Sequence, residues 1–374
     1  MQDSTFIGLD VHKATISVAV AQGERGGEVR HWGTILHRPD HVRKLVEKLA
    51  AGGRRLHFCY EAGPCGYGLY RQLVEMGHDC IVVAPSLIPV KAGDRVKTDR
   101  RDAVMLAKLH RAGELTAVWV PDAAHEAMRD LVRARATAVR VAGKARQHMQ
   151  GFLLRHGRIY PGKKGWTKAY RRWLPTVRFS HPAQQVVLQD YIDAVTDCEA
   201  RIERLTGQIA GLMSGWSLAP VVEAIQAMRG VAFIVAVTVV AEVGDFGRFD
   251  NPRQLMAYLG LTPAEHSSGA SVRRGGITKA GSGLARRALI EGAWSYRIQA
   301  RVSPKLQARL EALPKEVRDI AWKGQLRMCQ RYRHLMAAGK AKVVATTAIA
   351  REMLGFIWAI ARTATATPGC AMKA

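Results

Sequence analysis

The stretch from Phe6 to Val20, "FIGLDVHKATISVAV", decides the fold of the first part of the chain. Two runs rich in β-branched residues, Phe6–Val11 and Ala14–Val20, are separated by only two residues. This spacing predicts two strands joined as a hairpin. Because side chains alternate along a strand, Asp10 lies on the face opposite the apolar residues of its run.

The α/β pattern continues to about residue 120. Three further strands are predicted by "VRHWGTILH" from Val29, "LHFCYEAG" from Leu56 and "DCIVVAP" from Asp79. Helical patterns run from about Pro39 to Ala51 and through "YGLYRQLVEMG". A hairpin followed by alternating helices and strands predicts a mixed sheet with helices on its faces.

An acidic pair lies in "RVKTDRRDA", residues 95–103, within a cluster of four cations. In a helix that runs on to Gly113, Asp99 and Asp102 lie on one face, one turn apart. Two like charges this close repel each other, so we expect a neutralising group nearby. The alternative is that Asp99 caps the helix and Asp102 pairs with an arginine. For this stretch alone the two interpretations are equally good.

Two strand residues favour the functional interpretation of this pair. Asp10 comes from the first strand, and Glu61 ends the strand that starts at Leu56. In an RNase H-like sheet these elements are neighbours of the helix with Asp99 and Asp102, so the four carboxylates would converge. Two Mg²⁺ ions, which prefer oxygen ligands, would neutralise them and flank a phosphodiester. The cations that would attract the phosphate backbone are Arg95, Lys97, Arg100 and Arg101.

The composition points to a polyanionic partner. The chain has 374 residues, a formal net charge of +25 and a pI near 10.3, so nucleic acid is the expected partner. The six cysteines are scattered without a CxxC pair, which argues against zinc ribbons and a disulfide framework. The most apolar run, from Val231, is too short to span a bilayer and contains Glu242. We expect a soluble cytoplasmic protein that does not enter a membrane.

Residues 121–215 predict a helical hairpin or coiled coil. One helix runs from about Ala123 to Gly157, and a second, from about Pro182 to Met213, returns antiparallel to it. The connection between them, residues 158–179, has no acid, and its cations alternate with aromatic residues that could stack on unpaired bases. The alternative is a loop whose aromatic rings pack on the neighbouring helices. The residues concerned are Lys163, Lys164, Lys168, Arg171 and Arg172, with Tyr160, Trp166, Tyr170 and Trp173.

Residues 216–374 predict a mainly helical domain that contains a turn-rich serine loop. Two helices around Gly230 resemble a helix–hairpin–helix, although a plain buried helix pair fits equally well. In "LGLTPAEHSSGASVRRGGITKAG", adjacent Ser267 and Ser268 follow His266. A serine hydroxyl that attacks phosphorus needs a base, or a metal and cations. Without other motifs, Ser-Ser-Gly is more often a turn. The nearby cations are Arg273, Arg274 and Lys279.

Five motifs, taken together and in this order, resemble one family. They are "GLDVHK", "YEAG", "KTDRRDA", "YLGLTPAEHSSG" and "GGITKAG", and they cover nearly the whole chain. The chain resembles the transposases of insertion-sequence family 110, which are related to the Piv DNA invertases. One local departure is "GSGLARRAL", which leaves the substrate role of Arg286 and Arg287 open.

The resemblance implies a fold of class α/β plus α. Its first domain, residues 1–120, would be a RuvC-like RNase H fold whose DEDD tetrad maps onto Asp10, Glu61, Asp99 and Asp102. A helical coiled-coil region, residues 121–215, and a transposase domain, residues 216–374, would follow. In the family the nucleophilic serine directly precedes glycine, which matches Ser268, with Ser267 as the alternative.

The resemblance also implies an activity and partners. The expected activity is Mg²⁺-dependent DNA strand cleavage and exchange through a phosphoseryl–DNA intermediate. The expected partners are donor and target DNA, a structured non-coding RNA that guides some family members, and a dimer that pairs into a tetramer. A RuvC-like metal-dependent endonuclease, in which the acids activate water and the serine loop only grips DNA, is the main alternative. A non-catalytic nucleic-acid-binding protein ranks third.

Overall fold

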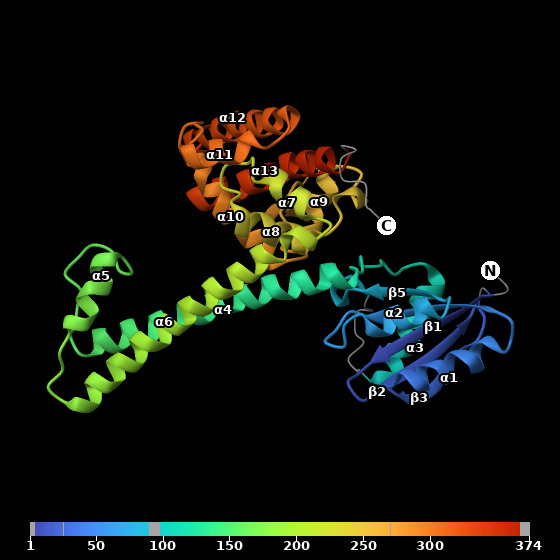
Figure 1. Cartoon of the computed structure of the whole chain (residues 1–374). Coiled ribbons are helices and arrows are strands. Elements are labelled where there is room, and N and C mark those ends of the chain that lie inside the picture. Colours follow the sequence, from blue (N-terminus) through green and yellow to red (C-terminus); the bar gives the residue numbers. More distant parts are fainter. Residues whose placement is uncertain (1–3, 25, 90–97, 270, 367–374) are drawn as a thin grey trace. The chain divides into compact units, whose positions relative to one another are not determined.

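The computed structural model describes residues 4–24, 26–89, 98–269 and 271–366 (Figure 1). Arg95 and Lys97 of the predicted basic cluster lie outside the described residues. The chain divides into two compact units, Met1–Val120 and Pro121–Ala374. The proposed further boundary between residues 215 and 216 falls inside the second unit and stays a prediction.

The first unit is built on a mixed five-stranded sheet of order β3-β2-β1-β4-β5. β1 pairs antiparallel with β2, from Thr5–Gln22 to Val11–Ile16, so the predicted hairpin is confirmed. β3 is antiparallel to β2, whereas β4 is parallel to β1 and β5 is parallel to β4. The strands are β1 (Ser4–Val11), β2 (Thr15–Gln22), β3 (Val29–Leu36), β4 (Arg55–Glu61) and β5 (Asp79–Val83).

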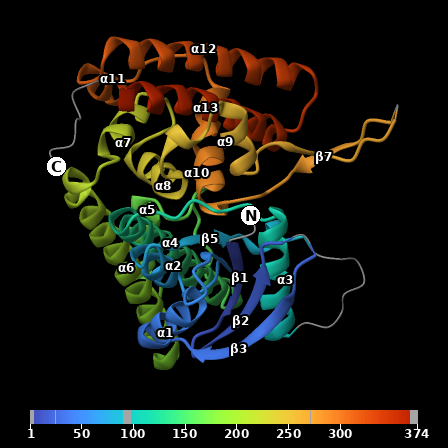
Figure 2. The same cartoon turned by 90° about the vertical axis from the view of Figure 1, so that its right-hand side faces the viewer.

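Helices cover both faces of this sheet. α1 (Pro39–Ala50) and α2 (Gly68–Glu75) share a core with Ile7 and Leu9, whose side chains leave one face of β1. α3 (Asp99–Ala112) packs on β1 and β2 from the other face (Figure 2). Gly8 makes this contact close, because a Cβ there would collide with the backbone of Ala103 and Ala107. The middle of α3 is therefore held against β1.

Two long helices of the second unit run side by side (Figure 1). They are α4 (Ala123–Arg155) and α6 (Pro182–Gly211), and α5 (Lys168–Trp173) lies in the connection between them. Arg135 of α4 donates to Thr206 of α6, while Arg146 contacts Glu199, so residue numbers rise on one helix as they fall on the other. The predicted antiparallel pairing is confirmed.

The remaining helices form a bundle with a small hairpin at its edge. α7 and α8 flank Gly230, whose φ is +84° and whose position is packed against the carbonyl of Gly292. This agrees with a buried helix pair. The elements are α7 (Ala219–Ile225), α8 (Phe233–Val243), α9 (Pro252–Tyr258), β6 (Pro263–Glu265), β7 (Arg274–Ile277), α10 (Gly283–Ala293), α11 (Pro304–Glu311), α12 (Lys315–Ala337) and α13 (Lys342–Ala366). Short 3₁₀ helices span Pro85–Leu87, Leu174–Thr176, Met213–Gly215, Phe246–Arg248 and Trp294–Arg297.

α13 is the one helix in the described part of the chain that is long and apolar enough to cross a membrane. It packs against α7, α9, α10 and α12, and Ile349, Met353 and Ile357 on it are fully buried. These are the contacts of a core helix, which explains its apolar composition without a bilayer.

Candidate active site

Strand pairing places Asp10 beside Glu61. The last registered pair of β1 and β4 is Leu9–Tyr60, and both side chains are buried in the core under α1 and α2. Side chains alternate, so the next residues on both strands, Asp10 and Glu61, point to the opposite face. That face is the one α3 covers, since Cys59 of β4 contacts the carbonyl of Leu106 there.

The first turn of α3 carries the other two acids. Thr98 is the N-cap, and its hydroxyl accepts a hydrogen bond from the backbone N–H of Arg101 at 3.3 Å. The interpretation of Asp99 as the cap is therefore wrong. Asp99 and Asp102 both lie in the first turn, where the helix dipole favours negative charge. The side chain of Asp99 is thus available for a role other than capping.

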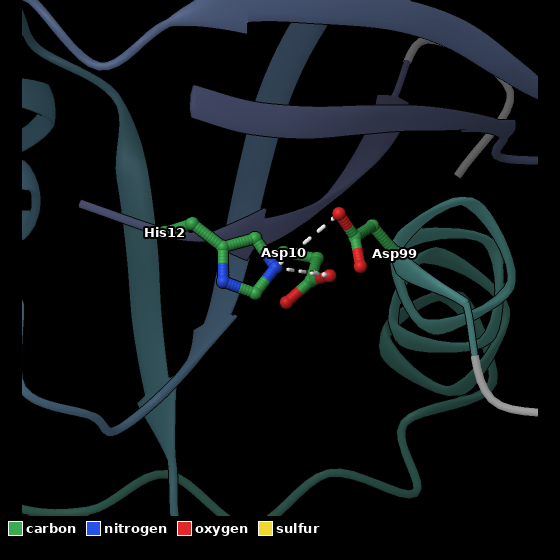
Figure 3. A group of neighbouring side chains, drawn as sticks. All are labelled: Asp10, His12 and Asp99. Carbon is green, nitrogen blue, oxygen red and sulfur yellow. Dashed lines mark hydrogen bonds and ion pairs between the residues drawn. The ribbon is translucent and has the colours of Figure 1, made fainter. Parts of the chain in front are cut away.

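Asp10, His12 and Asp99 form a compact group (Figure 3). His12 Nε2 lies 3.2 Å from Asp10 Oδ2 and 3.5 Å from Asp99 Oδ2. Burial raises the pKa of Asp10, the nearby His12 lowers it, and the charges of Asp99 and Asp102 raise it further. Asp99 and Asp102 are thus close enough to Asp10 to repel its carboxylate.

His12 was not identified from the sequence as a site residue. It follows Asp10 by two positions, so continued strand alternation could have placed it beside that carboxylate. The ring lies between two acids from different elements, β1 and α3. Only the packing of α3 on the sheet brings Asp99 to it.

The two carboxylates of this group suit a hard divalent cation, whereas the imidazole nitrogen of His12 is a ligand more typical of transition metals. Among the described residues, the atoms of Asp10, His12 and Asp99 lie within 4.8 Å of one another. Carboxylate oxygens are the ligands that such ions prefer. Asp102 and Glu61 fall outside this group, although Asp102 is near enough to affect Asp10 and Glu61 occupies the adjacent strand position.

The two serines lie on the β6–β7 hairpin of the second unit. β6 and β7 pair antiparallel, and Ser268 and Ser271 exchange backbone hydrogen bonds of 3.1 Å beyond the strand ends. Ser268 is exposed, and its hydroxyl has no hydrogen-bond partner among the described residues. It is therefore accessible to a ligand.

Ser267 has a different environment. Its hydroxyl donates to Glu265 Oε1 at 2.9 Å and accepts from the backbone N–H of Arg273 at 3.3 Å. Glu265 also receives a hydrogen bond from Arg274. The hydrogen bonds from Ser267 and Arg274 lower the pKa of Glu265. Glu265, which the sequence analysis did not single out, thus connects one serine to one of the predicted phosphate-binding cations.

Two neighbouring arginines on α10 have different hydrogen-bond partners. Arg286 donates to the carbonyls of Leu259 and Ala280, which flank the β6–β7 hairpin. Arg287 forms an exposed ion pair with Glu291 at 2.8 Å. Arg286 therefore anchors the base of the hairpin, and Arg287 does not.

The connection between α4 and α6 forms a small aromatic core. Tyr160, Trp166 and Trp173 pack around the buried Tyr170 at centroid distances of 5.1–5.6 Å. Arg146 lies over the Trp166 ring at 4.9 Å. Trp166 and Trp173 are half-buried in this cluster, so their predicted stacking on bases stays a prediction.

The predicted phosphate-binding cations are mostly on the surface. Arg171 is also exposed, but its guanidinium forms two 2.7 Å hydrogen bonds to Glu199, and these lower the pKa of that carboxylate. The other exposed residues are Arg100, Arg101, Lys163, Lys164, Arg172, Arg273, Arg274 and Lys279.

Comparison with known proteins identifies the family. A DEDD-type IS110 family model described as "Transposase" matches residues 7–157, which include the acidic cluster. The model described as "Transposase IS116/IS110/IS902 family" matches residues 222–311, which include the serine hairpin. A Sinorhizobium fredii protein with a transposase name, y4qE, is 53% identical over 97% of this chain and 90% of its own length. The chain belongs to the IS110 family of transposases.

More distant IS110 relatives match over most of their length as well. The transposase for insertion sequence element IS1533 of Leptospira borgpetersenii is 30% identical over 91% of this chain and 99% of its own length. The transposase for IS1111A of Coxiella burnetii is 25% identical over 78% of each chain. The resemblance inferred from the five motifs is confirmed.

Proposed function

We propose that this IS110-family transposase cleaves and exchanges DNA strands with Mg²⁺, through a covalent phosphoseryl–DNA intermediate. The observation that carries the proposal is the acidic cluster of Asp10 and Asp99, built from β1 and α3 inside the region that the DEDD family model matches. The sheet order β3-β2-β1-β4-β5, with α3 over β1, supports an RNase H-like, RuvC-like first domain.

The carboxylates would hold the metal. Asp10 and Asp99 are the first ligands, and Asp102 and Glu61 complete the set from the same helix turn and the neighbouring strand. The mutual repulsion of the aspartates supports this assignment, since a bound cation removes it. Mg²⁺ bound here would polarise the scissile phosphate.

Ser268 is the proposed nucleophile. Its hydroxyl oxygen forms a bond to phosphorus, the bond from phosphorus to the 3′-oxygen breaks, and the proton of the hydroxyl is transferred to the 3′-oxygen that leaves. The 3′-hydroxyl then attacks the phosphoserine of a partner strand, and that serine regains a proton. The number of phosphodiester bonds is conserved, so no high-energy cofactor is required.

Ser267 is the alternative nucleophile. Its hydrogen bond to Glu265 is the arrangement of a nucleophile with a base, while Ser268 has the exposure and the position before Gly269. In either case Arg273, Arg274 and Lys279 would neutralise charge on the phosphate. These roles require the hairpin to reach the phosphate held at the carboxylates.

The proposed partners beyond DNA rest on charge. The +25 net charge and the exposed Lys163, Lys164 and Arg172 on the α4–α6 connection suit a second polyanion, and a structured guide RNA fits this need. Strand exchange needs several active sites, so the proposed assembly is a dimer that pairs into a tetramer. We place this activity in the bacterial cytoplasm.

A nicked suicide substrate tests the mechanism. The wild-type chain should form a protein–DNA adduct with Mg²⁺ and none with EDTA. Ser268→Ala should abolish the adduct, whereas Ser267→Ala should retain it. If Ser268→Ala still becomes linked to DNA and Ser267→Ala does not, Ser267 is the nucleophile. Peptide mapping of the adduct gives an independent assignment.

The structure also supports a second candidate, a metal-dependent endonuclease. The acidic cluster forms entirely within residues 1–120, without a residue of the serine hairpin, so it could activate water. The product separates the two candidates. Hydrolysed DNA ends from a protein that lacks both serine hydroxyls would favour the endonuclease.

A further inference from the structure

A basic groove opens between three helices of the second unit. It has a volume of about 930 Å³ and is lined by residues of α9, α12 and α13. Arg327, Arg331 and His334 lie on one face of α12, at the i, i+4 and i+7 positions. Arg253 of α9 and Arg351 of α13 complete its basic lining.

The positive charge of the groove is poorly compensated. Glu352 is the one acid in its described lining, and it pairs with Arg327 at 2.8 Å. The guanidinium groups of Arg253, Arg331 and Arg351 form no ion pair or hydrogen bond with any residue in the described part of the chain. Three like charges around one hollow favour binding of an anion with more than one charge.

The groove also has an apolar floor. Pro252, Met256 and Ala348 line it, and all three are half-buried. Isolated phosphate would bind to the arginines alone and leave this floor uncovered. An unpaired nucleotide covers both parts, with its phosphate at the arginines and its base on the floor.

The position of the groove indicates which strand it holds. Thr262 lines the groove and directly precedes β6, and its carbonyl accepts from the N–H of Thr278 at the base of the serine hairpin. Ser268 comes six positions after Thr262, a distance of at most roughly 20 Å in extended chain. A strand in the groove is therefore a few nucleotides from the serines.

We propose that this groove binds an unpaired segment of the DNA strand that flanks the cleavage site. The identification of the strand as DNA rests on the proposed function. The binding itself depends only on the groove and requires neither Mg²⁺ nor the serine hydroxyls.

Binding of fluorescein-labelled dT12 by the full chain in EDTA tests the groove. Arg331→Ala and Arg351→Ala should each weaken binding about fivefold at 0.15 M salt and reduce the slope of log K against log salt by about 0.7. The matched control is Arg333→Ala, which removes the same charge from α12 roughly 200° around the helix and outside the groove. We expect a loss of less than twofold there.

A second variant tests the apolar floor without a change in charge. Ala348→Trp should weaken binding of dT12 but not of an abasic 12-mer with the same phosphates, and circular dichroism checks that the bundle stays folded. Equal losses for Arg331→Ala and Arg333→Ala would overturn the proposal. A loss on rU12 clearly larger than that on dT12 would assign the groove to RNA and overturn it too.

The outcome is separable from that of the suicide-substrate assay. If no covalent adduct forms but Arg331→Ala still binds dT12 more weakly than Arg333→Ala does, the groove proposal stands and the phosphoseryl mechanism is refuted. If the adduct forms but the two variants bind dT12 equally well, the mechanism stands and the groove proposal is refuted.

Discussion

Single residues decide the candidate metal centre. Asp10 and Asp99 approach the same ring nitrogen of His12 from a strand and a helix, although 89 positions separate them in the sequence. Burial and, to a smaller extent, repulsion from Asp99 and Asp102 raise the pKa of Asp10, and a bound cation would remove the repulsion. The centre is thus built for binding rather than for stability.

Asp10→Asn tests this interpretation. Mg²⁺ should raise the Tm of the wild-type chain, because a ligand that binds only the folded state stabilises it. The rise should disappear in the variant, and strand cleavage should fall by roughly a thousandfold. Differential scanning fluorimetry and a cleavage assay provide the measurements. Asp130→Asn, which removes an exposed acid on α4, should keep the wild-type response, and an unchanged Mg²⁺ response in Asp10→Asn would contradict the assignment.

Arg286 and Arg287 provide a matched pair on α10. Arg286→Ala leaves the carbonyls of Leu259 and Ala280 without their donor and should cost about 1–2 kcal/mol. Arg287→Ala removes an exposed ion pair and should cost less than about 0.5 kcal/mol. Adduct formation should fall only for Arg286→Ala, since the serine hairpin loses its anchor. Equal urea midpoints and equal adduct yields would refute this role.

At the scale of elements, close approach of α3 to β1 positions the acids. Gly8 leaves room for the backbone of α3. It comes two residues before Asp10 and therefore lies on the same face of β1. A side chain at position 8 would push α3 outward, and the first turn of that helix carries Asp99 and Asp102. Packing and site geometry are therefore coupled through one glycine.

Gly8→Ala should lower the free energy of unfolding by about 2 kcal/mol, because added volume in a packed contact forces the backbone to shift. The Mg²⁺-dependent rise in Tm should shrink as well. Gly143→Ala is the control, since nothing lies within 4 Å of a Cβ there and alanine favours the interior of α4 by about 1 kcal/mol. A Gly8→Ala chain as stable as the wild type would show that α3 is not held as described.

α4 is joined to α8 by a second element-scale contact. Arg133 donates to both carboxylate oxygens of Glu242, at 2.7 and 3.0 Å, and the Glu242 side chain is only 2% exposed. Burial alone would raise the pKa of Glu242, but the hydrogen bonds and charge of Arg133 hold it below its usual value of 4.5. The pair therefore stabilises the fold above about that pH.

Arg133→Ala should cost about 2 kcal/mol at neutral pH, because it removes the two hydrogen bonds of Arg133 from a buried carboxylate, while Ser282 and the charge of Arg129 still stabilise that carboxylate and Arg133 itself is half exposed. The contribution of a carboxyl with a depressed pKa is lost as the pH falls through that folded-state pKa. The Tm difference from the wild type should thus close below pH 4.5. Arg140→Ala on the same helix should show no such pH dependence, and a constant difference for Arg133→Ala would contradict the mechanism.

At the scale of the whole molecule, the acidic cluster and the serine hairpin belong to different units of the chain. The acidic cluster lies within residues 1–120, which have their own core around Phe58 and Tyr60. The serine hairpin and the basic groove belong to residues 121–374. A net charge of +25 over both units favours association with nucleic acid and gives that association a strong dependence on salt.

Residues 1–120, expressed alone, should fold and unfold in one cooperative transition, since their core cluster is contained within that range. Mg²⁺ should stabilise this fragment as it stabilises the full chain, and the fragment should form no adduct with a suicide substrate because it lacks both serines. Thermal denaturation with and without EDTA measures the first two properties. A fragment without a cooperative transition would show that the first unit depends on the second.

The elements themselves follow from local sequence, and the site only in part. Alternation, turn residues and charge patterns predict the β1–β2 hairpin, α3 and the antiparallel α4–α6 pair, because these signals act between residues a few positions apart. The acidic tetrad was predicted from the motifs together. The sequence did not predict Thr98 as the N-cap or His12 as the residue between Asp10 and Asp99. Several polar residues are neighbours at each place, and only the folded backbone determines which of them makes the contact.

The sequence alone determined the succession of strands and helices along the chain, the basic charge and the family, because periodicity, composition and contiguous motifs specify them. Tertiary structure decided that Asp10 and Asp99 both reach His12, that Arg286 supports the serine hairpin, and that Arg253, Arg331 and Arg351 share one groove. The physical reason is that such contacts join residues far apart along the chain. Their distances are set by side-chain packing between elements, which no local pattern records.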